Sequence, residues 1–311
     1  MTTAFTPNFS AVAAYSEAAA MVEAVRAQDW SKARSLLNDT SASSATELIR
    51  AGAGVPRSEE FFRAVLDRDP TDPAAATLLA RRHIDIGWGI RGTDLARNVS
   101  YGNFAAFHNH LRQAEQLLIS ACADDPTFAP AWCERLVTAR GLELGQAESR
   151  RRYDHLDRRA PHHPRAQTEL LQQLCPKWGG DLGRMHAFAT ACAAAAPAGA
   201  PNAALLVDAH LEHWLDSKKT DLRYFTDRAV QEEIRTAGER SVLHPDFQRT
   251  VGWVHAMSLL ALGYSLIGDW TQAKHCFTAL GSHGDRRGWQ YLPGGAGNSF
   301  ATNRAKAMSR G

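Results

Sequence analysis

Two histidines three residues apart, His210 and His213, have the spacing in this chain that is best suited to binding a metal ion. On a helix this spacing places both imidazoles on one side, and Asp208 and Glu212 lie beside them in the sequence. With a third imidazole from another helix, such as that of His186, the pair could hold a zinc or iron ion. The zinc-peptidase pattern His-Glu-x-x-His is absent, however, and among 13 histidines some close pairs arise by chance. Two partly buried histidines that hydrogen-bond to the backbone or to a carboxylate are the alternative interpretation.

A glycine-rich segment, residues 87–92, has the Gly-x-Gly-x-x-Gly spacing of a dinucleotide-binding loop. Such a loop needs a strand before it and an acidic residue about twenty positions later, whereas a charged, helical stretch precedes these glycines. We therefore interpret residues 87–103 as a loop insertion. Because long loops often form binding surfaces, we predict that Trp88, Arg91 and Tyr101 form a flap over a groove.

Motifs for nucleophilic catalysis and phosphate binding are missing from the sequence. No Ser-His-Asp or Cys-His arrangement can be assembled from local spacing, and no glycine-rich loop ends in Gly-Lys-Ser or Gly-Lys-Thr. No cofactor is predicted, and there is no positive reason to name an enzymatic activity. A non-enzymatic protein is the preferred interpretation.

The elements that carry these residues have helical periodicity. Apolar residues recur at i, i+3 and i+4 in Ala-, Leu- and Arg-rich stretches, and alternation with period two is almost absent, which predicts an all-α fold. Prolines follow the predicted helices, as they often do just after a helix ends. Pro126, Pro161 and Pro197 lie 35 and 36 residues apart, whereas Pro70 lies further upstream, beyond the predicted insertion.

A short pattern occurs near both ends of the chain. Asp29 is followed by a small residue, Ala33, and Asp269 is followed by Ala273, each with a large apolar residue four positions later. Small and bulky residues also alternate before three of the prolines: Ala114, Leu118 and Ala121; Ser149, Tyr153 and Leu156; Met185, Ala189 and Cys192. This combination is typical of helices packed in pairs along a repeat array.

These patterns resemble the tetratricopeptide family over roughly residues 58–200 and 255–281. Residues 174–189 and 209–215 further resemble a group of bacterial, largely actinobacterial, tetratricopeptide-like proteins. The resemblance implies a right-handed α-solenoid of irregular helical hairpins that binds a peptide or protein segment on its concave face. We predict a cap at residues 1–50, the array at 51–280 and a glycine-rich, basic tail at 281–311.

The main functional prediction is a non-enzymatic scaffold for a protein or peptide partner. Tetratricopeptide phasing places six candidate contact residues on the concave face: Glu134, Thr138, Gln167, Leu170, Lys177 and His255. The alternative is a helical enzyme or ligand-binding protein with a pocket near Lys177, His186, His210 and His213, with a bound metal ion as one option.

Composition narrows the partners and the compartment. Lys and Arg total 35 against 33 for Asp and Glu, a net charge of +2 that argues against nucleic acid or an anionic membrane as the main partner. The five cysteines form no Cys-x-x-Cys pair, so we expect free thiols and a cytoplasmic location. The first residues do not read as a signal peptide, and no apolar run reaches the length of a membrane span.

Overall fold

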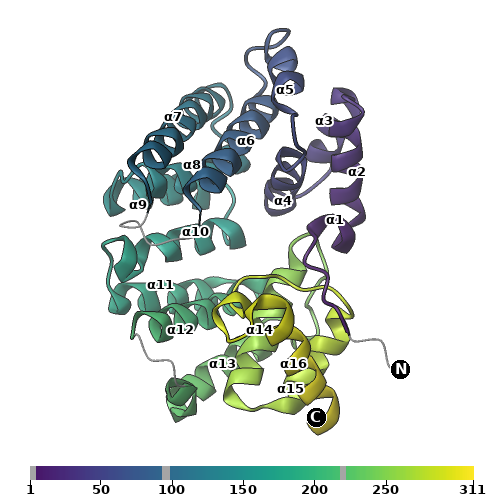
Figure 1. Ribbon diagram of the computed structural model, residues 1–311, viewed down its shortest axis with the longest axis vertical. Helices are drawn as coiled ribbons and strands as arrows, with labels where there is room; N and C mark the ends of the chain where they lie inside the picture. Colours follow the sequence, from purple (N-terminus) through teal and green to yellow (C-terminus); the bar gives the residue numbers. More distant parts are fainter. Residues whose placement is uncertain (1–4, 93–98, 218–221) are drawn as a thin grey trace. The chain divides into compact units, whose positions relative to one another are not determined.

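The computed structural model describes residues 5–92, 99–217 and 222–311 (Figure 1). Within these ranges all regular elements are helices, and the one β-type pairing is an isolated parallel bridge between Asn8 and His283. The predicted all-α class is therefore confirmed, and the solenoid arrangement stays a prediction. The chain divides into two compact units, which we call the central unit (Tyr15–Gln173) and the terminal unit (Met1–Ala14 with Leu174–Gly311). This division differs from the predicted boundaries near residues 50 and 280.

The central unit is built from consecutive helices that pack on their neighbours along the chain. The longest two, α6 and α7, lie side by side, and α8 packs against both (Figure 1). Every residue of α8 is buried, so this helix forms the middle of the unit. The helices are α2 (Ser16–Arg26), α3 (Trp30–Asn38), α4 (Ala42–Ala53), α5 (Glu59–Leu66), α6 (Pro73–Arg91), α7 (Tyr101–Asp124), α8 (Ala129–Gly141), α9 (Gln146–Asp157) and α10 (Pro164–Leu174).

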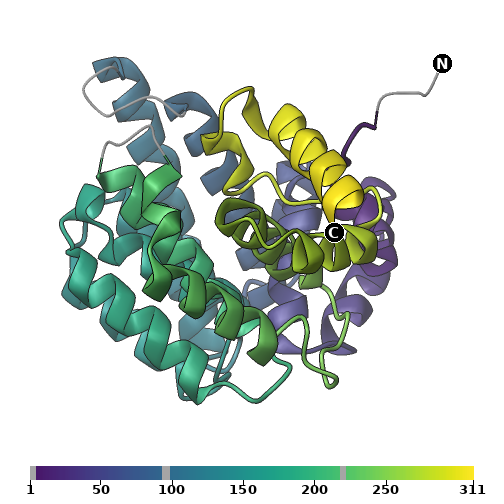
Figure 2. The same cartoon turned by 90° about the horizontal axis from the view of Figure 1, so that it is seen from below.

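The terminal unit is organised around α14, an apolar helix that packs against α12, α13, α15 and α16 (Figure 2). Most of the residues of α14 are buried, because they face these neighbours on nearly all sides. The helices are α1 (Ala11–Ala14), α11 (Leu182–Ala195), α12 (Leu205–Asp216), α13 (Arg228–Arg240), α14 (Trp253–Ile267), α15 (Trp270–Leu280) and α16 (Gly295–Arg310).

The pattern found near both ends of the sequence produces the same local structure twice. Asp29 begins α3 and accepts a hydrogen bond from the backbone N–H three residues on, and Asp269 does the same for α15. A side-chain cap of this kind stabilises a helix by about 1 kcal/mol. Before each aspartate, a residue with positive φ reverses the chain: Gln28 at 55° and Gly268 at 76°. In both turns the aspartate N–H donates to the carbonyl five residues earlier, at 2.9 Å.

The residues predicted to pack between paired helices are buried. Ala33 and Ala273 are fully buried, as the predicted close approach of two helices requires. The three sets that precede the prolines also lie in the interior, and each of those prolines follows the end of a helix (α7, α9 and α11). Small residues thus mark where helices meet closely, and this part of the sequence prediction is confirmed.

The predicted loop insertion is wrong at both of its ends. Helix α6 continues through residues 87–91, and α7 begins at Tyr101, while residues 93–98 lie outside the described part of the chain. Gly87 is buried in α6, where that helix lies close to α7. A Cβ at this position would lie only 3.3 Å from the Cβ of His110 and 3.4 Å from the Phe107 ring. The glycine allows α6 and α7 to approach and does not mark a nucleotide loop.

Residues 281–311, predicted as a tail that ends in a frayed helix, end in a helix that is well packed. Trp289 lies in a short 3₁₀ helix (Trp289–Tyr291), and Phe300 lies in the middle of α16; both are fully buried. Their ring centroids lie 5.8 Å and 5.1 Å from that of Phe277 on α15. Two aromatic anchors therefore fix a segment whose glycine-rich, basic composition is typical of a loose tail.

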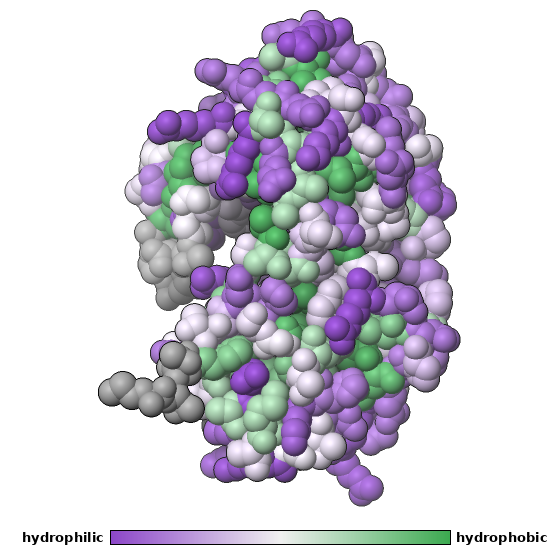
Figure 3. Space-filling view, turned by 90° about the vertical axis from the view of Figure 1, so that its right-hand side faces the viewer, coloured by the Kyte–Doolittle hydropathy of each residue, from purple (hydrophilic) through white to green (hydrophobic). Residues whose placement is uncertain are grey.

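Among the described residues, none of the helices combines the length and hydropathy that crossing a lipid bilayer requires. The face drawn in Figure 3 shows hydrophilic side chains interleaved with smaller hydrophobic areas.

Candidate functional site

Five side chains from four elements of the terminal unit meet in one cluster. Helix α11 contributes His186 and α12 contributes His210 and His213, which the spacing of three places on one side of that helix. Tyr224 comes from a 3₁₀ helix (Leu222–Thr226) and Glu233 from α13. We call these five residues the histidine cluster. The structure thus brings together the three histidines that the sequence had singled out.

His210 lies between two partners, one on each ring nitrogen. Its Nε2 is 2.9 Å from Oε2 of Glu233, and its Nδ1 is 2.7 Å from the Tyr224 hydroxyl. A carboxylate only accepts hydrogen bonds, so Nε2 of neutral His210 carries the proton. Nδ1 is then the acceptor, and the Tyr224 hydroxyl donates to it.

His213 links Tyr224 to the third imidazole. Its Nδ1 lies 3.1 Å from the Tyr224 oxygen and 3.0 Å from Nε2 of His186. Because the Tyr224 proton points to His210, the Tyr224 oxygen is free to accept from Nδ1–H of His213. The single Nδ1 proton of His213 therefore faces two acceptors, the Tyr224 oxygen and Nε2 of His186. The hydrogen-bonded chain runs from Glu233 through His210 and Tyr224 to His213, with His186 in contact at its end.

Burial keeps the imidazoles of the cluster uncharged at neutral pH. It lowers the pKa of His210 to about 4, and the nearby His213 acts in the same direction. Burial, followed by the proximity of His210 and His213, lowers the pKa of His186 to about 4. Burial also lowers the pKa of His213 and raises that of the Tyr224 hydroxyl. Neutral imidazole is the form that binds a metal ion.

Three members of the cluster have the geometry of a metal-ligand set. One donor atom each from His186, His210 and Glu233 lies within 4.8 Å of the others. Tetrahedral zinc, with bonds of about 2.0–2.2 Å, requires neighbouring donors roughly 3.4 Å apart. Small side-chain rotations would bring the donor atoms from within 4.8 Å to that separation. The Glu233 side chain is half exposed, so it is free to move toward the imidazoles. Two imidazoles and a carboxylate suit zinc, iron(II), cobalt or manganese.

Tyr224 and Glu233 were missed at the level of sequence. Tyr224 lies in a short 3₁₀ helix that carries no periodic pattern, and Glu233 occupies the exposed side of an amphipathic helix. Their spacing from His210 follows no motif, because separate elements bring them to it. No local signal could have identified either residue.

Four of the six predicted concave-face residues lie inside the central unit. Glu134 is fully buried, and its carboxylate accepts hydrogen bonds from Arg50 at 2.7 Å and Arg81 at 2.9 Å. The other three, which are also buried, are Thr138, Gln167 and Leu170. A partner would reach these side chains only if the surrounding helices moved.

The other two predicted contact residues lie in the terminal unit with acidic partners. Lys177, on a 3₁₀ helix (Pro176–Trp178), places its Nζ 2.7 Å from Oε2 of the buried Glu212. His255, on α14, places its Nδ1 3.0 Å from Oδ2 of Asp285. Lys177 retains 45% side-chain exposure, so it is the more accessible of the two.

The residues predicted to form a flap belong to helices. The Trp88 ring, on α6, lies 4.8 Å from that of Phe107, and the Arg91 guanidinium lies over the Trp88 ring at 5.4 Å. Tyr101 is the first residue of α7 and is 90% exposed. Trp88 and Arg91 therefore stabilise the α6–α7 pair instead of extending from a loop.

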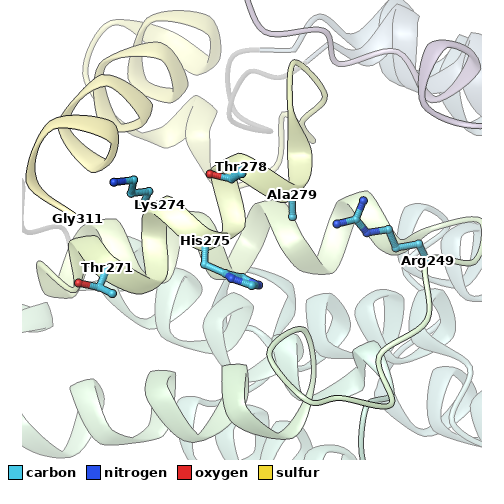
Figure 4. A pocket seen from close by; sticks show the side chains of 7 residues that line it. All are labelled: Arg249, Thr271, Lys274, His275, Thr278, Ala279 and Gly311. Atoms are coloured by element: carbon cyan, nitrogen blue, oxygen red, sulfur yellow. The ribbon is translucent and has the colours of Figure 1, made fainter.

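A shallow pocket of about 460 Å³ lies along α15 (Figure 4). Of its basic side chains, Lys274 and His275 come from α15 and Arg249 from the segment before α14, and they do not converge on one point (Figure 4). Among the described residues, the pocket therefore offers no set of side chains that could hold one ligand atom from several sides, as the histidine cluster does.

Neither a protein-family model nor a curated protein sequence matches the chain. The histidine cluster is therefore interpreted from its own geometry and electrostatics.

Proposed function

We propose that this protein binds one divalent transition-metal ion through His186, His210 and Glu233. The observation that supports the proposal is the convergence of three donor atoms, from α11, α12 and α13, within 4.8 Å of one another. Two of the donors are imidazoles that burial keeps neutral, so neither must lose a net charge before it binds a cation.

Tyr224 has a supporting role in this proposal. When Nε2 of His210 binds the ion, the imidazole proton must move to Nδ1. The Tyr224 hydroxyl then turns its own proton away from His210, and its oxygen accepts from Nδ1–H across the observed 2.7 Å. An outer partner of this kind fixes the orientation and tautomer of a ligating histidine. His213, which also contacts Tyr224, lies close enough to His186 to hold that ring in place.

Elemental analysis of the freshly purified protein, with calorimetric titration of Zn²⁺ into metal-free protein, tests the proposal. We expect close to one ion per chain and loss of binding in the double variant His186→Ala/His210→Ala. His275→Ala, at an exposed histidine on α15, is the matched control and should bind like the wild type. Equal binding by the double variant and the control would reject the site.

A protein-binding scaffold remains the second candidate function. It is favoured by one observation: the terminal unit already holds an extended segment of chain, residues 5–10, against its C-terminal elements. Native mass spectrometry of the protein purified from its own cells should then detect a co-purified partner. Isolation of the protein alone under gentle conditions would count against this function.

A further inference from the structure

The segment of residues 5–10 is bound to the terminal unit as an extended peptide would be. The Asn8 N–H donates to the Ser282 carbonyl at 2.7 Å, and the Gly284 N–H donates to the Asn8 carbonyl at 3.0 Å. These two bonds form the parallel bridge to His283. In Figures 1 and 2 the N-terminal segment runs beside the C-terminal elements of this unit. Backbone pairing of this type is one of the common modes of peptide recognition.

The side chains of the segment alternate between the unit and solvent. Phe5, Pro7 and Phe9 are half-buried, whereas the three residues between and after them are exposed. Period two is the pattern of an extended chain that lies with one side on a surface. The segment therefore presents two aromatic side chains, four positions apart, to the same surface.

Phe300 receives both aromatic side chains. Its ring centroid lies 6.2 Å from that of Phe5, with the rings nearly parallel at 11°, and 5.9 Å from that of Phe9, with the rings perpendicular at 88°. Offset stacking and edge-to-face packing are the two preferred geometries of aromatic pairs. A fully buried residue of α16 is thus covered by the segment from two directions.

Two arginines and a glycine complete the surface. The guanidinium carbon of Arg304 lies 4.0 Å from the centroid of Phe5, and that of Arg286 lies 5.2 Å from the centroid of Phe9. Contacts of this geometry favour aromatic side chains. A Cβ at Gly284 would lie 3.0 Å from the Phe9 ring and 2.8 Å from the Phe300 ring, so only glycine leaves room for Phe9. We call the surface made by Ser282, Gly284, Arg286, Phe300 and Arg304 the acceptor groove.

The segment is held less firmly than the unit that it covers. Its anchoring side chains are only half-buried, whereas Phe300 and most of α14 are inaccessible to solvent. Segments with few buried contacts open at a lower free energy than the core does. The segment can therefore leave the groove while the helices stay folded.

We infer that the acceptor groove is a docking site for an extended peptide with two phenylalanines four residues apart, and that residues 5–10 occupy it in cis. The inference rests on the second proposed function, the scaffold, and names the chemistry of its partner. An incoming segment must be extended, carry aromatic side chains at the positions of Phe5 and Phe9, and displace the chain's own copy.

A binding experiment with the full-length chain tests this inference. The probe is a fluorescein-labelled peptide with the sequence of residues 4–11, and the protein is the variant Phe5→Ala/Phe9→Ala, whose own segment no longer competes. We expect the peptide to bind this variant at least about tenfold more tightly than the wild type, because a tethered competitor has a high effective concentration. A peptide with both phenylalanines replaced by alanine is the matched control.

Two further measurements decide the remaining outcomes. Adding Gly284→Val to the double variant should abolish peptide binding, because the new side chain fills the position of the Phe9 ring. If the double variant loses its helical circular dichroism, hydrogen exchange of the wild type decides instead: excess unlabelled peptide should accelerate exchange in residues 5–10 and leave α14 unchanged.

Equal binding of the two peptides to a folded double variant, or unchanged exchange in residues 5–10, would overturn the groove. If a co-purified partner is nevertheless found, only the groove is rejected and the scaffold function stands.

Discussion

The hydroxyl of Tyr224 donates a hydrogen bond to Nδ1 of His210 across 2.7 Å, while Nε2 of the same ring donates to Glu233. The Tyr224 bond joins a 3₁₀ helix to α12 and gives the second ring nitrogen of a buried histidine its partner. Removing the hydroxyl leaves the carbon skeleton of the cluster in place, so its effect can be measured on binding alone.

Tyr224→Phe is expected to weaken metal binding about 10- to 100-fold, because loss of an outer partner of a ligating histidine typically has an effect of this size. Calorimetric titration of Zn²⁺ into the metal-free variant measures it. Tyr291→Phe, at an exposed tyrosine of the same unit, is the control. An affinity of Tyr224→Phe equal to that of the control would show that the hydroxyl does not support a metal ligand.

The buried carboxylate of Glu134 should be important for stability. Glu134→Ala leaves Arg50 and Arg81 without the carboxylate that both contact, and we expect a loss of about 3–5 kcal/mol in the free energy of unfolding. Asp154→Ala breaks an exposed pair with Arg150 at a similar distance, 2.8 Å, and should change stability by about 0.5 kcal/mol or less. Urea denaturation followed by circular dichroism compares the two variants, and similar losses would contradict the assignment.

Two glycines in the central unit should respond oppositely to alanine. A Cβ at Gly141 would lie only 2.3 Å from Cδ1 of Leu111, so Gly141→Ala should destabilise by about 1–3 kcal/mol through overpacking. Gly89 lies in α6 with nothing within 4 Å of its Cβ position, so Gly89→Ala should stabilise by about 0.5–1 kcal/mol. Thermal unfolding measures both changes. A destabilised Gly89→Ala variant would argue against a helix at residues 87–91.

Acidification should destabilise the central unit through His163. This residue is buried, its Nδ1 accepts from the Ala166 N–H, and its Nε2 contacts the Thr46 hydroxyl at 3.0 Å. Burial lowers its pKa to about 4, whereas the unfolded value is about 6.5. The unfolded state therefore binds a proton first, so the contribution to stability is complete above about pH 6.5 and is lost as the pH falls toward 4.

The loss attributable to His163 is up to about 3 kcal/mol, from the difference in pKa between the two states. His163→Gln has no such titration, so its free energy of unfolding should decrease less steeply between pH 7 and pH 4.5. Other buried histidines, such as His210, keep part of the slope in the variant. Parallel stability curves for the variant and the wild type would rule out this role.

The parts of the fold that follow local rules could be predicted from sequence. The cap at Asp269, the buried Ala273 and the prolines after helices depend on spacings within one helical pair, and all three are present. Gly87 was misinterpreted because its role depends on α7, a separate element, and not on its own neighbours. The burial of Phe300 was missed because the prediction for residues 281–311 followed their glycine-rich, basic composition, whereas one aromatic side chain anchors the segment.

The candidate site was predictable only in its histidines. His210 and His213 share a helix, so their spacing is visible in the sequence. Glu233 comes close to them only through the packing of α12 with α13, which depends on tertiary structure. The phasing that selected Glu134 as a contact residue placed it on a helix that is buried on every side.

The composition of the terminal unit has a consequence for synthesis on the ribosome. Residues 5–14 are synthesised before the central unit but belong with residues 174–311, so the acceptor groove that receives Phe5 and Phe9 is made after that unit. The central unit is translated in between and can fold as soon as it emerges. A nascent chain therefore carries an unbound segment at residues 5–10 until α16 leaves the exit tunnel, and docking of that segment follows the synthesis of α16.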